Sequence, residues 1–166
     1  MDKNLIPKYR SKGVLVDTNL LVCLIAGLYS PDFMQDFKRT SNMKKEDFEI
    51  IKKFLNQFKK IVVTPHILTE VNSFLNQIGE PNKVEVIKTF LAQLEVLDEE
   101  FELANKIGRS VGLQTFVNVG LTDSAIIHHA KGKYLVFTDD GRLTNFLTLH
   151  KIDYINYNHL KQYQPE

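Results

Sequence analysis

Short runs of branched apolar residues alternate along the chain with longer segments that are apolar on one face only. Residues 14–16, 61–63 and 134–137 show no polar alternation, which is typical of strands covered on both faces in a parallel sheet. Further strands are predicted at residues 154–157 and, very briefly, at 95–97. Because strands separated by helices favour right-handed crossovers, the pattern predicts an α/β fold.

Helical spacing of apolar residues predicts the elements between these strands. The segments with this spacing lie at about residues 20–26, 42–60, 65–78, 84–94, 98–110, 124–130 and 142–150. Thr64 and Pro65 supply a cap and a first-turn proline for the third of them. The segment GLQTFVNVGLTD is predicted to be a loop that delivers Thr122 as a helix cap and Asp123 into the following first turn.

Length and composition are consistent with a single domain over residues 1–166, with its core at about residues 13–157. A chain of 166 residues with 43% hydrophobic content can bury one sizeable core, and the net charge of +1 excludes no partner. The one cysteine, Cys23, lies in an apolar helix, which indicates a packing role and a reducing compartment. Since neither a secretory signal nor a membrane-spanning stretch is visible, we expect a cytoplasmic protein without a membrane partner.

Acidic residues stand where predicted strands end or where the following helices begin. Asp17 ends the first buried run, Asp139 and Asp140 end the fourth, and Glu70 lies in the second turn of a helix that starts at a strand end. Taken alone, Glu70 reads as a surface residue and Asp123 as a helix-capping residue. The carboxyl ends of parallel strands share one sheet edge, however, so these acids are expected to converge.

A convergent acidic cluster predicts a metal site. Crowded carboxylates repel one another unless they are protonated or neutralised by a cation. Oxygen ligands without cysteine suit a hard divalent ion, Mg²⁺ or Mn²⁺, and the five histidines show no spacing typical of a metal cluster. Since such ions also bind phosphate and activate water, the cluster indicates phosphate chemistry.

Four segments together resemble the PIN-domain nucleases. They are VDTN at Asp17, P-x-x-x-x-E-V with Glu70, G-L-T-D-S-A-I with Asp123 and L-V-F-T-D-D-x-x-L after the fourth strand, in the family's order over residues 13–156. The resemblance implies a three-layer α/β/α sandwich with a parallel sheet of about five strands. It also implies a metal-dependent endoribonuclease, which in bacteria is commonly the toxin of a toxin–antitoxin pair.

The same resemblance implies roles for individual residues. Asp17, Glu70, Asp123 and Asp140 would form the acidic quartet that holds Mg²⁺ or Mn²⁺, with Asp139 as the alternative to Asp140. The family's pattern places its last acid two residues after the threonine, which favours Asp140. Two polar residues, Asn19 and Thr138, would orient the acids or the attacking water.

The chain departs from the small toxins in a longer interval between Asp17 and Glu70. The helix predicted at about residues 42–60 occupies the excess, and Lys45, Lys52 and Lys59 fall on one stripe of it. The stripe is either an RNA contact or an ordinary solvated face. The segment itself would serve as an extra wall for RNA, a homodimer surface or a seat for an antitoxin protein, and the sequence does not choose among them.

Two other functions remain open beside the nuclease. A phosphotransfer or phosphatase domain also carries acids at the tips of parallel strands, although Asn19 stands where a dehalogenase-type phosphatase needs a second aspartate. A receiver domain needs its acid pair near the first strand, whereas the pair here follows the fourth. The third possibility is a noncatalytic RNA-binding module whose acids only cap helices.

Overall fold

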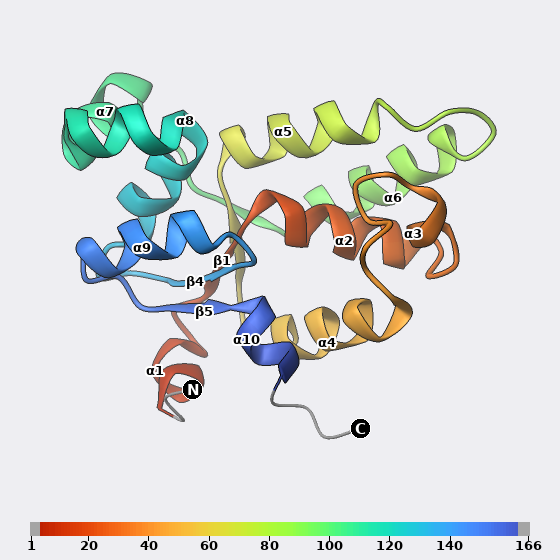
Figure 1. Ribbon diagram of the computed structural model, residues 1–166, viewed down its shortest axis with the longest axis horizontal. Helices are drawn as coiled ribbons and strands as arrows, with labels where there is room; N and C mark the ends of the chain where they lie inside the picture. Colours follow the sequence, from red (N-terminus) through yellow and green to blue (C-terminus); the bar gives the residue numbers. More distant parts are fainter. Residues whose placement is uncertain (1–3, 163–166) are drawn as a thin grey trace.

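The computed structural model describes residues 4–162 and is built on one five-stranded sheet (Figure 1). Its strands are β1 (Val14–Val16), β2 (Ile61–Val63), β3 (Asp98–Glu99), β4 (Leu135–Thr138) and β5 (Tyr154–Asn156). Every neighbouring pair is parallel, and the order across the sheet is β3-β2-β1-β4-β5. The predicted α/β fold with a parallel sheet of about five strands is therefore confirmed.

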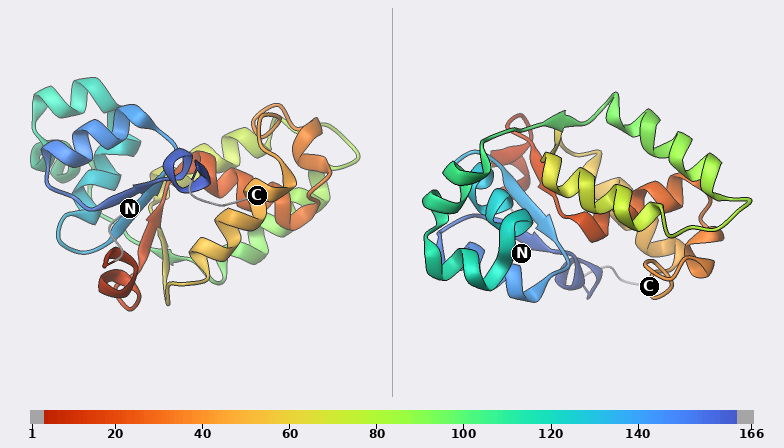
Figure 2. Two further views of the ribbon diagram at one scale, coloured as in Figure 1. Left: turned by 60° about the horizontal axis from the view of Figure 1, so that its bottom comes forward. Right: turned by 90° about the horizontal axis from the view of Figure 1, so that it is seen from above.

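Helices cover both faces of this sheet. Their bounds are α1 (Leu5–Tyr9), α2 (Thr18–Tyr29), α3 (Phe33–Asp36), α4 (Lys45–Leu55), α5 (Pro65–Leu75), α6 (Lys83–Leu94), α7 (Ala104–Val111), α8 (Leu113–Ala130), α9 (Gly141–Leu149) and α10 (Tyr157–Gln162). Helices α7, α8 and α9 lie on one side of the strands, and the group formed by α2, α4, α5 and α6 lies on the other (Figure 2). The arrangement is a three-layer α/β/α sandwich, as expected.

Helix α2 forms the centre of the larger helical layer. It packs against α3, α4, α5 and α6, and all its residues from Leu20 to Gly27 are buried. A helix that is apolar all round is stable only when it is enclosed in this way. Cys23 lies in this helix with no exposed surface, and burial raises the pKa of its thiol to about 12. The predicted packing role of Cys23 is confirmed.

The strand order reverses direction between β1 and β4. From β1 the chain moves to β2 and then β3, whereas from β4 it moves to β5 on the opposite side. In open α/β sheets such a switch point leaves a crevice outside the carboxyl ends of the strands. The register pairs Val16 with Phe137, so the next residues, Asp17 and Thr138, lie side by side at this crevice.

The prediction for residues 95–123 is wrong in three respects. The third strand is Asp98–Glu99 rather than 95–97, and because both its residues are exposed at the sheet edge, no buried apolar run marks it. Asp98 therefore does not cap a helix, and α7 begins only at Ala104. The predicted loop is instead the first part of α8, which is interrupted at Gly120 with φ 79° and ψ −173°. Only glycine adopts this conformation readily, and the break restarts the helix just before Asp123.

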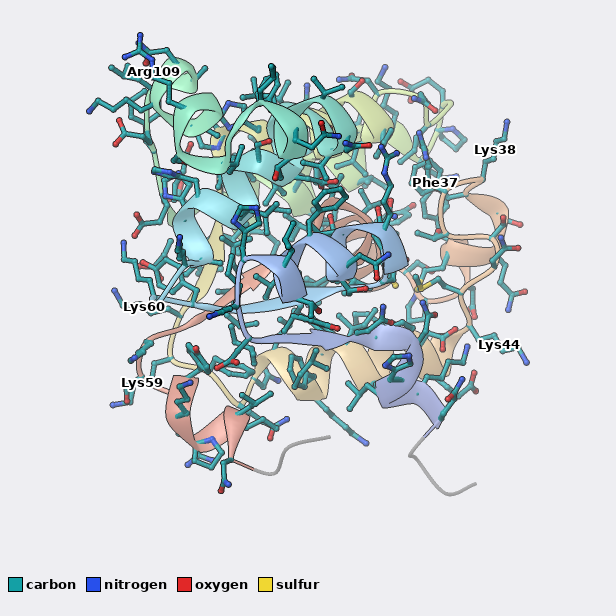
Figure 3. The ribbon with its side chains drawn as sticks, turned by 60° about the vertical axis from the view of Figure 1, so that its left-hand side comes forward. Phe37, Lys38, Lys44, Lys59, Lys60 and Arg109 are labelled. Carbon is teal, nitrogen blue, oxygen red and sulfur yellow. The ribbon has the colours of Figure 1, made fainter. Side chains whose placement is uncertain are left out.

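The helix predicted at about residues 42–60 is shorter in the structure. Helix α4 begins at Lys45, where the backbone N–H of Lys44 donates to Asp47 Oδ2 over 2.6 Å, and it ends at Leu55. Lys59 consequently lies beyond the helix, near α1 and far from Lys44 (Figure 3). The Lys52 ammonium lies 5.3 Å from the ring centroid of Phe48 on its own helix. The single stripe expected of Lys45, Lys52 and Lys59 is therefore not formed.

The contact between α2 and α4 yields a prediction about stability. A Cβ at Gly27 would overlap the ring of Phe48, so Gly27→Ala forces either the Phe48 side chain or helix α4 itself to shift. Overpacking of this kind costs about 1–3 kcal/mol. We expect urea unfolding of Gly27→Ala to show that loss, while Gly79→Ala, which meets nothing within 4 Å, stays within about 0.5 kcal/mol of the parent protein. Equal stability of the two variants would contradict the close packing of α2 on α4.

Candidate active site

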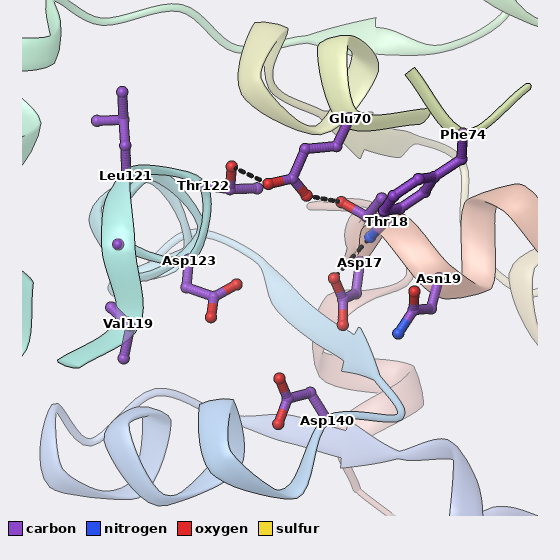
Figure 4. A pocket seen from close by; sticks show the side chains of 11 residues that line it. Asp17, Thr18, Asn19, Glu70, Phe74, Val119, Leu121, Thr122, Asp123 and Asp140 are labelled. Carbon is purple, nitrogen blue, oxygen red and sulfur yellow. Dashed lines mark hydrogen bonds between the residues drawn. The ribbon is translucent and has the colours of Figure 1, made fainter. Parts of the chain in front are cut away.

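A pocket of about 280 Å³ lies at the carboxyl edge of β1 and β4 (Figure 4). Four acidic side chains from separate parts of the chain line it: Asp17, Glu70, Asp123 and Asp140. They are supplied by the end of β1, by α5, by α8 and by the start of α9. The structure thus brings together the acids that the sequence analysis expected to converge.

Asp17 is the most deeply buried of these acids, with 6% of its surface exposed. It caps α2: its Oδ1 accepts from the backbone N–H of Thr18 over 2.6 Å, and its Oδ2 accepts from the Thr138 hydroxyl over 2.5 Å. Burial raises the pKa of Asp17 to about 6, reinforced by the charges of Asp139 and Asp140 and opposed by the two hydrogen bonds.

Glu70 is held by hydroxyl groups at both of its oxygens. Thr18 Oγ1 donates to Oε2 over 2.9 Å, and Thr122 Oγ1 donates to Oε1 over 2.7 Å. The carboxylate is therefore fixed between α2 and α8 (Figure 4). Sequence reasoning gave Thr18 no role and made Thr122 a helix cap. The available signal was that each threonine is the immediate neighbour of a predicted acid, Asp17 or Asp123.

Asp123 differs from the other acids because no residue within the described range 4–162 donates a hydrogen bond to its carboxylate. It is partly buried, and burial together with the charges of Asp17, Asp140 and Glu70 raises its pKa to about 7, with the charge of Arg142 acting in the opposite sense. The acids in the pocket therefore interact electrostatically, as like charges in a shared site must.

Only one residue of the Asp139–Asp140 pair lines the pocket. Asp140 does so while capping α9, since its Oδ1 accepts from the backbone N–H groups of Arg142 over 2.6 Å and Leu143 over 3.2 Å. Asp139 lies outside the lining, where its Oδ1 accepts from Asn19 Nδ2 over 3.3 Å. Burial raises the pKa of Asp139 as well. The geometry agrees with the preference for Asp140 as the fourth acid.

The two polar residues named from the sequence lie beside the acids. The Thr138 hydroxyl donates to Asp17 and accepts from the backbone N–H of Asp140 over 2.9 Å, so it connects two of the carboxylate-bearing positions. Asn19 is exposed, lines the pocket and orients Asp139. In contrast, Lys45, Lys52 and Lys59 do not belong to the pocket lining.

The donor set suits a hard divalent cation by its chemistry. The four pocket carboxylates offer only oxygen, and burial, followed by the charges of neighbouring carboxylates, raises the pKa values of Asp17 and Asp123. Across residues 4–162, however, no group of three acidic, histidine or cysteine side chains is arranged closely enough to hold a metal ion. A cation would therefore have to draw the carboxylates of the pocket together.

Comparison with known proteins adds no assignment. No protein-family model matches the chain, and neither a curated protein nor a solved structure matches it. The resemblance to PIN-domain nucleases therefore stays a prediction that rests on the four motifs. Of the helices within residues 4–162, none combines the length and the apolar character needed to cross a membrane.

Replacement of Asp123 by the isosteric amide tests the electrostatics of the pocket. Because the folded-state pKa of Asp123 is raised to about 7, the folded protein binds more protons than the unfolded chain between about pH 4 and 7, and its stability falls as the pH rises through that window. Asp123→Asn removes this penalty. We expect the melting temperature of the metal-free variant to exceed that of the parent by a few degrees at pH 8, and to match it near pH 4.

Glu99→Gln provides the matched control, because Glu99 is an exposed acid at the far edge of the sheet. This variant should follow the pH dependence of the parent protein throughout. If Asp123→Asn were less stable than the parent at pH 8, the carboxylates of the pocket would not be repelling one another.

Proposed function

We propose that this protein is a metal-dependent ribonuclease that hydrolyses RNA phosphodiester bonds in the acidic pocket. One observation carries the proposal: Asp17, Glu70, Asp123 and Asp140 come from four separate elements and face the same pocket at the switch point of the sheet. Helix capping accounts for the places of Asp17 and Asp140, whose strands end side by side, but Glu70 and Asp123 are not the N-caps of their helices and still face the same pocket. The Asp123 carboxylate in particular accepts no hydrogen bond from any residue within 4–162, and it interacts with the negative charges of the other three acids.

The four carboxylates would hold Mg²⁺ or Mn²⁺. When bound, such an ion supplies charge stabilisation for the phosphate and a water of lowered pKa. The chain's own contribution is to fix the acids before the substrate arrives. Thr138 fixes Asp17 through a hydroxyl hydrogen bond, and the Thr18 and Thr122 hydroxyls fix both oxygens of Glu70. Prepositioned groups of this kind avoid reorganisation during the reaction.

Cleavage of RNA is the direct test. We expect the protein to cut a labelled RNA in Mg²⁺ or Mn²⁺ and to stop when a chelator is added. Asp17→Asn or Asp123→Asn should reduce the rate on the order of a hundredfold or more, because either change removes a negative charge from the pocket. Gel analysis of labelled structured and single-stranded RNA measures the rates.

Two controls make the cleavage experiment decisive. Glu99→Gln removes an exposed acid outside the pocket and should leave the rate unchanged. A phosphate monoester assayed in parallel distinguishes a phosphatase, which would release phosphate from it and leave the RNA intact. Equal RNA cleavage by the parent protein and Asp17→Asn would remove the assignment of the pocket as the active site.

Thr122 allows a separate test of carboxylate positioning. Thr122→Val keeps the shape of the side chain but removes the hydrogen bond to Glu70 Oε1. Hydrogen bonds to charged groups contribute about 1.5–3 kcal/mol, so we expect kcat to fall about tenfold to a hundredfold with little change in KM. Thr122→Ser retains the hydroxyl and should restore most of the activity. A rate for Thr122→Val equal to that of the parent would show that Glu70 needs no support from α8.

A further inference from the structure

Phe74 is an aromatic residue in the wall of a pocket otherwise dominated by carboxylates. It follows Glu70 by four positions on α5, and residues four apart share one face of a helix. Figure 4 shows the two side chains on the same side of α5. Phe74 is also only partly buried, so its ring lies beside the acids and is not enclosed in the core.

A guanidinium group covers this ring. Arg39, from the segment between α3 and α4, places its guanidinium carbon 3.6 Å from the centroid of the Phe74 ring. No carboxylate within residues 4–162 forms an ion pair with Arg39, and its side chain is exposed. The face of the guanidinium turned away from Phe74 and its N–H donors are therefore accessible to a ligand.

Arg39 belongs to a cationic stretch of the chain. Residues 38–45 contain Lys38, Arg39, Lys44 and Lys45 and no acidic residue. Lys38 and Lys44 project from the same side of the molecule, well apart from each other (Figure 3). Positive charge here offsets the repulsion that the acidic pocket exerts on a polyanion. The stretch lies in the long interval between Asp17 and Glu70, whose role the sequence alone leaves open.

We propose that the Arg39–Phe74 pair is a stacking platform that receives an unpaired base of the RNA substrate. This inference rests on the proposed function, because it places the base beside the phosphodiester bond that the acids act on. A base stacks on the guanidinium plane, while the N–H groups of Arg39 donate to a backbone phosphate. In a duplex the bases are stacked on one another and cannot use this platform.

Binding measured without cleavage tests the platform independently of the nuclease. In an Asp17→Asn background with Mg²⁺, we would titrate a fluorescent single-stranded RNA oligonucleotide and the same sequence annealed to its complement. The Phe74 ring holds the Arg39 guanidinium on which the base stacks, and loss of base stacking weakens affinity about fivefold to a hundredfold. We expect Phe74→Leu to weaken single-strand binding by at least about fivefold and to leave duplex binding unchanged, whereas Phe74→Tyr, which keeps the ring, should bind like the parent.

Arg39 supplies the second pair of variants, which also covers the case in which Phe74→Leu folds poorly. Arg39→Gln should weaken single-strand binding and lower the slope of log affinity against log salt by about one. Arg39→Lys keeps the charge and the salt slope but loses the planar group, so it should recover only part of the affinity. Arg10→Gln is the matched control, because Arg10 is also an exposed arginine but lies at the end of α1, and its loss should not discriminate single strands from duplex.

Specific results would overturn the platform. Equal single-strand binding by Phe74→Leu and Phe74→Tyr would do so, as would an equal loss of single-strand and duplex binding in Arg39→Gln. Unchanged RNA binding in every variant would mean that the pair only pins the 30–44 segment to α5 or receives a protein partner. Cleavage assays separate the two proposals. If the parent protein and Phe74→Leu cut RNA at the same rate, the platform alone is refuted. If Phe74→Leu weakens RNA binding but the parent protein does not cut RNA, the nuclease alone is refuted.

Discussion

Four carboxylates face one pocket at the point where the strand order of the sheet reverses, and for Asp17 and Asp123 burial and the charges of neighbouring acids oppose folding at neutral pH. For Asp17 the pKa rises from 3.8 to about 6, which corresponds to roughly 3 kcal/mol of lost stability once the group is ionised. This loss of stability is absent at pH values below the unfolded-state pKa of Asp17 and is fully present at pH values above its folded-state pKa. Such an arrangement persists only if the surrounding fold holds the acids in place.

The surrounding fold holds them through rigid elements and short hydrogen bonds. The backbone N–H of Asp17 donates to the carbonyl of Phe137 over 3.0 Å, which keeps Asp17 in register with β4. Asp17 and Asp140 each cap a helix, where the partial positive charge of the helix N-terminus favours a carboxylate. The Thr18 and Thr122 hydroxyls fix Glu70. Asp123 alone lacks such support within residues 4–162, so its charge is the least compensated of the four.

The sequence predicted the parts of the fold in which burial and periodicity agree. The branched apolar runs at residues 14–16 and 61–63 predict the bounds of β1 and β2 to the residue, because a short run of this kind without polar alternation is typical of a buried parallel strand. The sequence predicts the edge strand at residues 95–97 instead of Asp98–Glu99, because the pairing that forms it involves the backbone of exposed residues rather than a side-chain pattern. For the first part of α8 the sequence predicts a loop, because its glycine and polar residues resemble a turn.

The candidate site was predictable for a different reason. Parallel strands bring their carboxyl ends to one edge whatever the loop lengths are, so Asp17, Glu70, Asp123 and Asp140 could be grouped without exact helix boundaries. The hydroxyl partners of Glu70 could not be found in the same way. The contact from Thr18 depends on the rotation of α2, and the contact from Thr122 depends on the break at Gly120, neither of which is encoded in a local pattern.

The long interval between Asp17 and Glu70 has a physical consequence for an acidic pocket. A pocket lined by carboxylates repels the phosphates of a nucleic acid, and a cation within the pocket neutralises only its immediate surroundings. Attraction must therefore come from charge placed on the rim rather than in the lining. Arg39 is held on that rim by Phe74, a residue of the helix that also carries Glu70. One turn of α5 thus carries Glu70, whose carboxylate suits a metal ion, and Phe74, which holds the Arg39 guanidinium that suits a phosphate.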